Sequence, residues 1–249
     1  MQAQEIAKRL ITEQPLLHFA SEDLAREVVE YTGLDFKAGP TNFAVASFVI
    51  EYLAQIVKSD HLTIETGGGH TTVLLAALSR HHTCVTPDTK SIESITAYME
   101  EVGIPKDKVS FVPESSEIAL PKLEVREKLD FAYIDGNHAY PIPAIDWHFI
   151  DLHMKVGGII GLDNAEIPAV EEVCVFLEKN KTYRWLKTLI CPPEAKQNYC
   201  VKFYTKVKDE PQPRSATVQP FNHRRVTKNT FADSLRTMFQ IKGKPWPWS

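Results

Sequence analysis

The stretch Leu62-Thr63-Ile64-Glu65-Thr66-Gly67-Gly68-Gly69-His70-Thr71-Thr72 changes character at its three glycines. The short apolar run before them is typical of a strand, and the apolar residues Val73 to Leu78 after them are typical of a helix. A glycine-rich turn between a strand and a helix brings backbone N–H groups close to a ligand. The sequence therefore predicts a ligand-binding turn within an α/β fold.

Two common ligands of such turns do not suit this one. A dinucleotide fingerprint, G-x-G-x-x-G, would use Gly67 and Gly69, but Thr72 stands where the third glycine belongs. A phosphate-binding P-loop needs a lysine after its last glycine, and none follows Gly69. The carboxylate of Glu65 repels phosphate and attracts an ammonium group. The turn is therefore expected to hold a cationic, amino-bearing ligand.

Strand and helix patterns alternate after the turn, which predicts a parallel sheet with helices on both faces. A final pair of strand-like segments, 183–190 and 199–207, is separated by too few residues for a crossover helix, so it should form an antiparallel hairpin. The other expected strands are 62–64, 82–86, 109–112, 129–134 and 156–162, and the expected helices are 71–78, 89–102, 142–154 and 168–179.

The pattern divides the chain into three parts. Residues 1–59 are expected to form a helical cap, with a helix beginning near Ser21, a loop at 33–40 and a second helix over 43–57. Residues 60–207 carry the alternating pattern. Residues 208–249 form a basic tail with a possible helix at 230–239, and a lid, an oligomer arm and a solvated tail are open alternatives for it.

Composition narrows the function classes. The 249 residues are 43% hydrophobic and 24% charged, which suits one α/β domain with additions. A formal net charge of -4 gives no sign of binding to nucleic acid or to a membrane surface, and the first residues do not resemble a signal peptide. The four cysteines form no C-x-x-C pair, which favours buried free thiols and a cytoplasmic protein. A small-molecule substrate is expected, and a homo-oligomer stays possible.

The loop pattern E-x-G-x-G-x-[ST]-T, formed by Glu65, Gly67, Gly69, Thr71 and Thr72, resembles the cofactor loop of the class I S-adenosylmethionine-dependent methyltransferases. S-adenosylmethionine carries an amino group and a sulfonium and no phosphate, which suits the acid. The resemblance covers roughly residues 41–207. It implies a doubly wound, seven-stranded, mainly parallel sheet with a C-terminal antiparallel hairpin, and it assigns the five loop residues to the cofactor.

The same resemblance suggests two further cofactor contacts. Asp88, shortly after the second strand of the series, would take the ribose hydroxyls, and Ser116, after the third, would border the adenine. Each has a purely structural alternative. Asp88 is equally suited to cap the helix that begins at Thr89, and Ser115 or Ser116 to cap a helix of its own.

The segment Ile134-Asp135-Gly136-Asn137-His138-Ala139-Tyr140 resembles the IDG-x-H-x-Y signature of a small-molecule group, methyltransferase family 24. Asp135 ends a buried strand at the carboxyl edge of the sheet, where open α/β sheets bind ligands, cofactor included. His138 follows on the loop and titrates near neutrality, so it could take a proton from a hydroxyl nucleophile. The alternative for His138 is an ordinary surface histidine.

The next strand ends in Asp163-Asn164. Asp135, Asp163 and Asn164 would then offer three hard oxygen ligands at one sheet edge, which suits Mg²⁺. The pattern resembles the metal site of the catechol and caffeoyl-CoA O-methyltransferases, except that His138 stands where those enzymes have a lysine. A loop turn with local side-chain bonds is the alternative.

These observations together predict an O-methyltransferase that acts on a small hydroxylated molecule, such as a sugar or a phenolic natural product, with Mg²⁺ and with His138 as base. Three rivals stay open: the same enzyme without a metal, an inactive adenosyl-ligand-binding partner subunit, and a nicotinamide-dependent oxidoreductase. The missing third glycine and the terminal hairpin weigh against the oxidoreductase.

Overall fold

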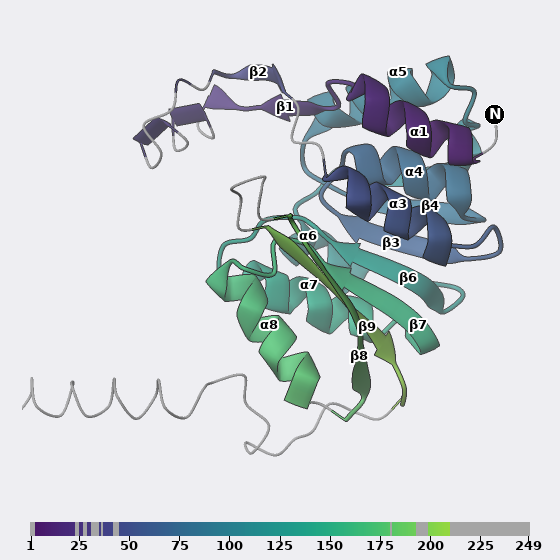
Figure 1. Cartoon of the computed structure of the whole chain (residues 1–249), viewed down its shortest axis with the longest axis vertical. Helices are drawn as coiled ribbons and strands as arrows, with labels where there is room; N and C mark the ends of the chain where they lie inside the picture. The colour runs from purple at the N-terminus through teal and green to yellow at the C-terminus, as the bar shows by residue number, and fades with distance from the viewer. Residues whose placement is uncertain are drawn as a thin grey trace, which may run out of the picture.

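The fold is built on one seven-stranded sheet in the order β5-β4-β3-β6-β7-β9-β8 (Figure 1). The structure is a computed structural model, and it describes residues 3–22, 25–26, 29–30, 35, 37–41, 45–179, 181–192 and 199–209. Strand β9 runs antiparallel to both of its neighbours, and the pairs among β3 to β7 are parallel. The predicted parallel series with a terminal antiparallel hairpin is therefore confirmed, and β9 enters between β7 and β8.

Helices separate the strands along the chain as the pattern predicts. The strands of the main sheet are β3 (Leu62–Thr66), β4 (His81–Val85), β5 (Val109–Val112), β6 (Leu129–Ile134), β7 (Met154–Leu162), β8 (Tyr183–Ile190) and β9 (Cys200–Lys206). The helices are α1 (Ala3–Glu13), α3 (Ser47–Ile56), α4 (His70–Leu78), α5 (Thr89–Glu101), α6 (Ser116–Ala119), α7 (Ile142–Asp151) and α8 (Pro168–Lys179), with 3₁₀ turns η1 (Lys106–Lys108) and η2 (Leu120–Lys122).

Each face of the sheet has its own apolar core. Helices α1, α3, α4 and α5 cover one face, and α6, α7 and α8 cover the other (Figure 1). Strand β6 lies between the two cores and is buried along its whole length, as its continuous apolar run predicts. Its side chains alternate, so Phe131 and Tyr133 join the first core while Ala132 and Ile134 join the second.

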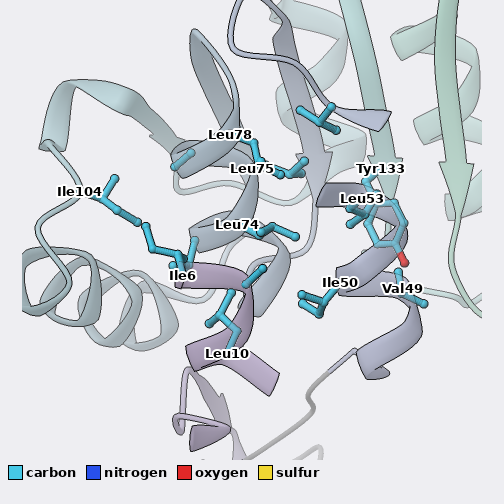
Figure 2. Close-up of a cluster of buried hydrophobic side chains, with 14 of the residues drawn as sticks. Ile6, Leu10, Val49, Ile50, Leu53, Leu74, Leu75, Leu78, Ile104 and Tyr133 are labelled. Atoms are coloured by element: carbon cyan, nitrogen blue, oxygen red, sulfur yellow. The ribbon is translucent and has the colours of Figure 1, made fainter. Parts of the chain in front are cut away.

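The N-terminal helices belong to the first core. Figure 2 shows Ile6 and Leu10 of α1 beside Leu74 and Leu75 of α4, with Leu53 of α3 close to Tyr133. Because these side chains are almost completely buried, α1 and α3 contribute to the stability of the sheet domain. No helix among the described residues is long and apolar enough to cross a membrane.

The structure departs from the sequence-based expectation in a short sheet near the N-terminus. Strands β1 (His18–Ala20) and β2 (Gly39–Thr41) pair antiparallel, where helix and loop were expected. Three-residue strands contain too little pattern to be recognised, and they form here by pairing across about twenty residues. The expected helix over 142–154 also ends earlier, because Met154 already begins β7. The expected helix at 230–239 lies outside the described residues.

The buried position of α3 leads to a stability prediction. Leu53→Ala should lower the free energy of unfolding by about 2–5 kcal/mol, because the side chain is 0% exposed and leaves a cavity against α4 and β6. Leu152→Ala, at a side chain that is 51% exposed, is the control and should change it by about 0.5 kcal/mol or less. Urea denaturation measures both, and equal effects would show that α3 does not belong to the folding unit.

Candidate functional site

A cavity of about 270 Å³ lies at the carboxyl edge of the main sheet. The segments that follow four neighbouring strands line it: 67–68 after β3, 85–88 at the end of β4, 115–117 after β5 and 135–137 after β6. His18 and Ser91 complete the lining. Of the residues predicted to bind a cofactor, Gly67, Asp88, Ser116 and Asp135 line this cavity.

Gly67 follows β3 and lies against the backbone of the loop that follows β6. Its φ of 82° lies in the left-handed region that favours glycine, and a Cβ at this position would overlap the backbone carbonyl of Asp135. The backbone N–H of Gly67 donates to the carbonyl of Val85 at 3.0 Å, and the N–H of Asp135 donates to that of Thr66 at 3.1 Å. Glycine is required here by both conformation and space, so the loops after β3, β4 and β6 keep a fixed relative position.

The other predicted loop residues do not line the cavity: Glu65, Gly69, Thr71 and Thr72. Thr72 accepts from the N–H of Gly69 at 2.9 Å and donates to Oε1 of Glu65 through a short hydrogen bond. His82 places its Nε2 3.1 Å from the same Glu65 oxygen. Thr72, which stands in place of a third glycine, therefore closes the turn with its hydroxyl.

Glu65 itself is completely buried. Its second oxygen, Oε2, has no hydrogen-bond partner among the described residues. A buried carboxylate with one oxygen unsatisfied is costly unless a donor or cation reaches it. The position beneath the glycine turn is consistent with the expected amino-group contact, and that contact stays a prediction.

Asp88 and Ser116 occupy helix starts that face the cavity. Asp88 caps α5, because its Oδ1 accepts from the backbone N–H groups of Lys90 and Ser91, both at 3.1 Å, and its Oδ2 accepts from the Ser91 hydroxyl. The capping role is thus present, and Asp88 still lines the cavity. Ser116 is the first residue of α6 and is buried. The ribose and adenine roles of these two residues stay predictions.

Asp146 lies on α7, the helix that follows the loop of Asp135 and His138. The side chain is 0% exposed. Burial raises the pKa of Asp146 to about 6, although the nearby hydroxyls of Ser116 and Thr66 act to lower it. A carboxyl group with this pKa is partly protonated under mildly acidic conditions. Asp146 lies near residues at the end of β3 and after β5, through the hydroxyls of Thr66 and Ser116.

The predicted catalytic and metal residues Asp135, His138 and Asp163 do converge. One possible ligand atom from each lies within 4.8 Å of the others, and His138 Nε2 is 3.7 Å from Asp135 Oδ1. Burial, followed by the charge of Asp163, raises the pKa of Asp135 well above its usual value, and burial also raises the pKa of Asp163. Two facing carboxylates of this kind need a shared proton or a cation between them.

His138 remains uncharged near neutral pH. Burial lowers its pKa below 6.5, although Asp163 and Glu166 act in the opposite direction. Its Nε2 is buried and has no hydrogen-bond partner among the described residues. A neutral imidazole with an open nitrogen can accept a proton or bind a metal.

Two tyrosines that sequence reasoning missed hold Asp163. The hydroxyls of Tyr133 and Tyr199 both donate to Asp163 Oδ1, at 2.5 Å and 2.7 Å. Both bonds act to lower the pKa of Asp163, and they turn its other oxygen away from these partners. Tyr133 lies in the apolar strand β6, where a buried hydroxyl must find a hydrogen-bond partner, so the sequence could have indicated a polar role for it. Tyr199 precedes β9, and nothing in the sequence indicated its contact with Asp163.

Asn164 follows Asp163 in a left-handed conformation with a φ of 49°. Its amide nitrogen donates to Glu166 at 2.9 Å, and Glu166 also accepts from the backbone N–H of Cys200 at the same distance. These bonds tie the end of β7 to the start of β9 without using the amide oxygen of Asn164. The local turn expected as an alternative is therefore present, and a ligand role for the oxygen stays a prediction.

Comparison with known proteins agrees with this geometry. Residues 64–165 match the family model described as a methyltransferase domain. The matched segment runs from β3 through Asp163 and includes the cavity loops and the acidic cluster, apart from His18. A search of curated proteins found no match.

Several solved structures share the fold at low identity. An O-methyltransferase from Klebsiella pneumoniae, itself called putative, is 16% identical over 83% of this chain and 96% of its own, with a TM-score of 0.60. The O-methyltransferase TomG from Streptomyces achromogenes, in complex with SAM, is 16% identical over 84% and 100%, with a TM-score of 0.57. An rRNA methylase from Streptococcus thermophilus is 16% identical over 64% and 93%, with a TM-score of 0.52. This chain carries a methyltransferase domain of the class I S-adenosylmethionine-dependent fold, and it is an enzyme.

The close contact at Gly67 leads to a test of the cavity. Gly67→Ala should lower the free energy of unfolding by roughly 2–5 kcal/mol, because alanine strains the left-handed backbone and displaces the Asp135 carbonyl. Binding of S-adenosylhomocysteine, measured by calorimetry, should be lost with it. Gly103→Ala is the matched control, since Gly103 has a φ of 74° and open space around it. It should cost only about 1–2 kcal/mol and leave binding unchanged. Retention of binding by Gly67→Ala would contradict the assignment.

The buried carboxyl of Asp146 leads to a pH prediction. Its folded-state pKa of about 6 lies above the usual aspartate value of 3.8, so the folded protein binds the proton more tightly than the unfolded chain. Wild-type stability should fall as the pH rises from about 4 to 6, by up to about 3 kcal/mol from this group. Asp146→Asn should lack this part of the fall, as chemical denaturation at several pH values would show. Parallel curves for the two proteins would contradict the prediction.

Proposed function

We propose that this enzyme is an O-methyltransferase that uses S-adenosylmethionine to methylate a small hydroxylated molecule, with Mg²⁺ bound by Asp135, Asp163 and Asn164 and with His138 as the base. The observation that carries the proposal is the convergence of Asp135, His138 and Asp163 beside the cavity that Gly67 helps to form. Asp135 lines the cavity and belongs to the cluster, so the cofactor site and the chemical site share a residue.

The side chains present suit a divalent cation. Two carboxylates with raised pKa values face each other, and hard oxygen ligands are those that Mg²⁺ prefers. The hydroxyls of Tyr133 and Tyr199 orient Asp163, as hydrogen-bond donors around metal sites commonly orient the carboxylate ligands. When bound, Mg²⁺ would orient the acceptor hydroxyl and lower its pKa.

His138 is suited to take the acceptor proton. Its neutral ring has an open Nε2 at the edge of the cluster. In the proposed reaction the acceptor oxygen forms a bond to the methyl carbon, the carbon–sulfur bond breaks with its electrons remaining on sulfur, and the acceptor proton moves to His138 Nε2. Asp135 Oδ1 lies 3.7 Å from this nitrogen, where its charge would stabilise the imidazolium that forms.

Aromatic side chains near the cluster support a small acceptor with an apolar ring or face. Phe48 of α3 contacts Tyr199, with ring centroids 6.1 Å apart, and the Tyr199 hydroxyl reaches Asp163. Tyr140, two residues after His138, is 80% exposed. The N-terminal helix α3 thus contributes to the surroundings of the cluster, as expected of an acceptor pocket. A sugar or a phenolic natural product is the acceptor class we propose.

A metal-independent enzyme is the second candidate. The open Nε2 of His138 favours it, since an imidazole with a lowered pKa can act as a lone base. The pair of raised carboxylates would then hold a shared proton. Direct metal binding separates the two candidates.

Mg²⁺ binding to the wild-type protein should be detectable by calorimetry and should raise the melting temperature. Asp163→Ala should abolish both effects while leaving affinity for S-adenosylhomocysteine nearly unchanged, because Asp163 does not line the cavity. His138→Ala should retain Mg²⁺ and lower kcat by roughly 10²–10⁴-fold in a methyl-transfer assay against sugars and phenols. His148→Ala, at an exposed histidine on α7, serves as the control.

Three outcomes would overturn parts of the proposal. Wild-type methyl transfer that survives EDTA would favour the metal-independent enzyme. Loss of Mg²⁺ binding in His138→Ala would make His138 a fourth ligand and remove it as base. Tight cofactor binding with no turnover of any hydroxylated acceptor would support the inactive partner subunit.

A further inference from the structure

His18 lies outside the matched methyltransferase segment, yet it forms part of the cofactor cavity. Strand β1 carries it there and is held in place by pairing with β2 and by a 3.0 Å hydrogen bond from the N–H of Phe19 to the Ser91 hydroxyl. Ser91 also donates to Asp88, so β1 is linked to the start of α5. The position of His18 is therefore tied to a residue of the cavity wall.

His18 packs directly on the glycine turn. A Cβ at Gly69 would overlap its imidazole ring. The φ of Gly69 is 175°, an extended value that any residue adopts, so the close approach of His18 is what requires glycine there. The ring also stacks on His70, the first residue of α4, with centroids 6.1 Å apart. His18 thus covers the point where β3 passes into α4.

His18 differs in the sign of its possible charge from the other ionisable side chains that line the cavity. Asp88, Glu117 and Asp135 line it, and Glu65 is buried near the end of β3, just before the glycine turn. Among the lining residues that the structure describes, His18 is the single side chain able to carry a positive charge. The amino-acid end of S-adenosylmethionine carries a sulfonium, an ammonium and a carboxylate. The acids suit the two cations, whereas the carboxylate needs a donor that the acids cannot supply.

We propose that His18 binds the carboxylate of the cofactor's amino-acid moiety, which makes the β1 segment part of the cofactor site. The proposal rests on the cofactor named under the proposed function, and it is independent of the metal and of the acceptor. Its geometric basis is the contact of His18 with Gly69, since the expected position of the amino-acid end is at the glycine turn, beside Glu65. The partial positive charge at the start of α4 acts in the same direction.

His70 does not compete for this role. Its side chain is 2% exposed, and burial, followed by the charge of His18, lowers its pKa to about 4. It is therefore neutral at physiological pH and serves as the surface against which the His18 ring stacks. A positive charge on His18 is therefore not repelled by a positive charge on His70.

The test compares two ligands that differ at the carboxylate end. S-adenosylhomocysteine has the complete amino-acid moiety, and 5′-methylthioadenosine lacks it. His18→Gln should weaken S-adenosylhomocysteine roughly tenfold to a hundredfold, the effect of losing a charge-assisted hydrogen bond, and should leave 5′-methylthioadenosine within about twofold. His18→Lys, which restores a positive charge, should recover most of the lost affinity. Calorimetry without added metal measures all of these affinities.

The controls separate this inference from the proposed function. His148→Gln removes an exposed histidine from α7 and should bind both ligands like the wild type. Equal weakening of both ligands by His18→Gln would mean that His18 is only a wall of the cavity, and unchanged affinity for S-adenosylhomocysteine would remove the contact altogether. Failure of the wild-type protein to bind S-adenosylhomocysteine would overturn the cofactor assignment itself.

Discussion

The contact between Gly67 and the backbone of Asp135 is the constraint on which the site depends. With no side chain at Gly67, the carbonyl of Asp135 can occupy the space beside the turn after β3. This contact places the glycine turn and the acidic loop after β6 side by side at the carboxyl edge of the sheet. A larger residue would separate them, and the cavity and the acidic cluster would no longer share Asp135.

An excess of negative charge is the second organising feature. Glu65, Asp135, Asp146 and Asp163 are all wholly or partly buried around one sheet edge. Burial of so many carboxyl groups is unfavourable in the absence of protons or cations. A sulfonium, an ammonium and a divalent cation would offset this cost at three places along the edge. The buried acids thus lie where the proposed cationic ligands would offset their electrostatic cost, and His18 is the residue proposed for the cofactor's carboxylate.

Hydroxyl groups keep these carboxylates oriented. Thr72 bonds to Glu65, Ser91 to Asp88, and two tyrosines bond to Asp163. The donors to Glu65 and Asp163 come from other elements than the acid, so these two acids are held by the packing of the fold, whereas Ser91 and Asp88 bond to each other at the start of α5. Such hydrogen bonds restrict the orientations that the carboxylates can adopt, as the partners of ligand side chains commonly do in binding sites.

The sequence by itself determined the order of the elements and the position of the glycine turn between β3 and α4. Apolar runs with strand or helical spacing are local patterns, so they can be read from neighbouring residues along the chain. The glycine turn, Asp135 at the end of a strand and the Asp163-Asn164 pair are local features of the same kind. Only the tertiary structure decided that Tyr133 and Tyr199 share one oxygen of Asp163, and that His18 lies on Gly69. These contacts join residues whose separation along the chain carries no periodic signal, because they are created by the packing of β1, β6 and the segment before β9 around a common sheet edge.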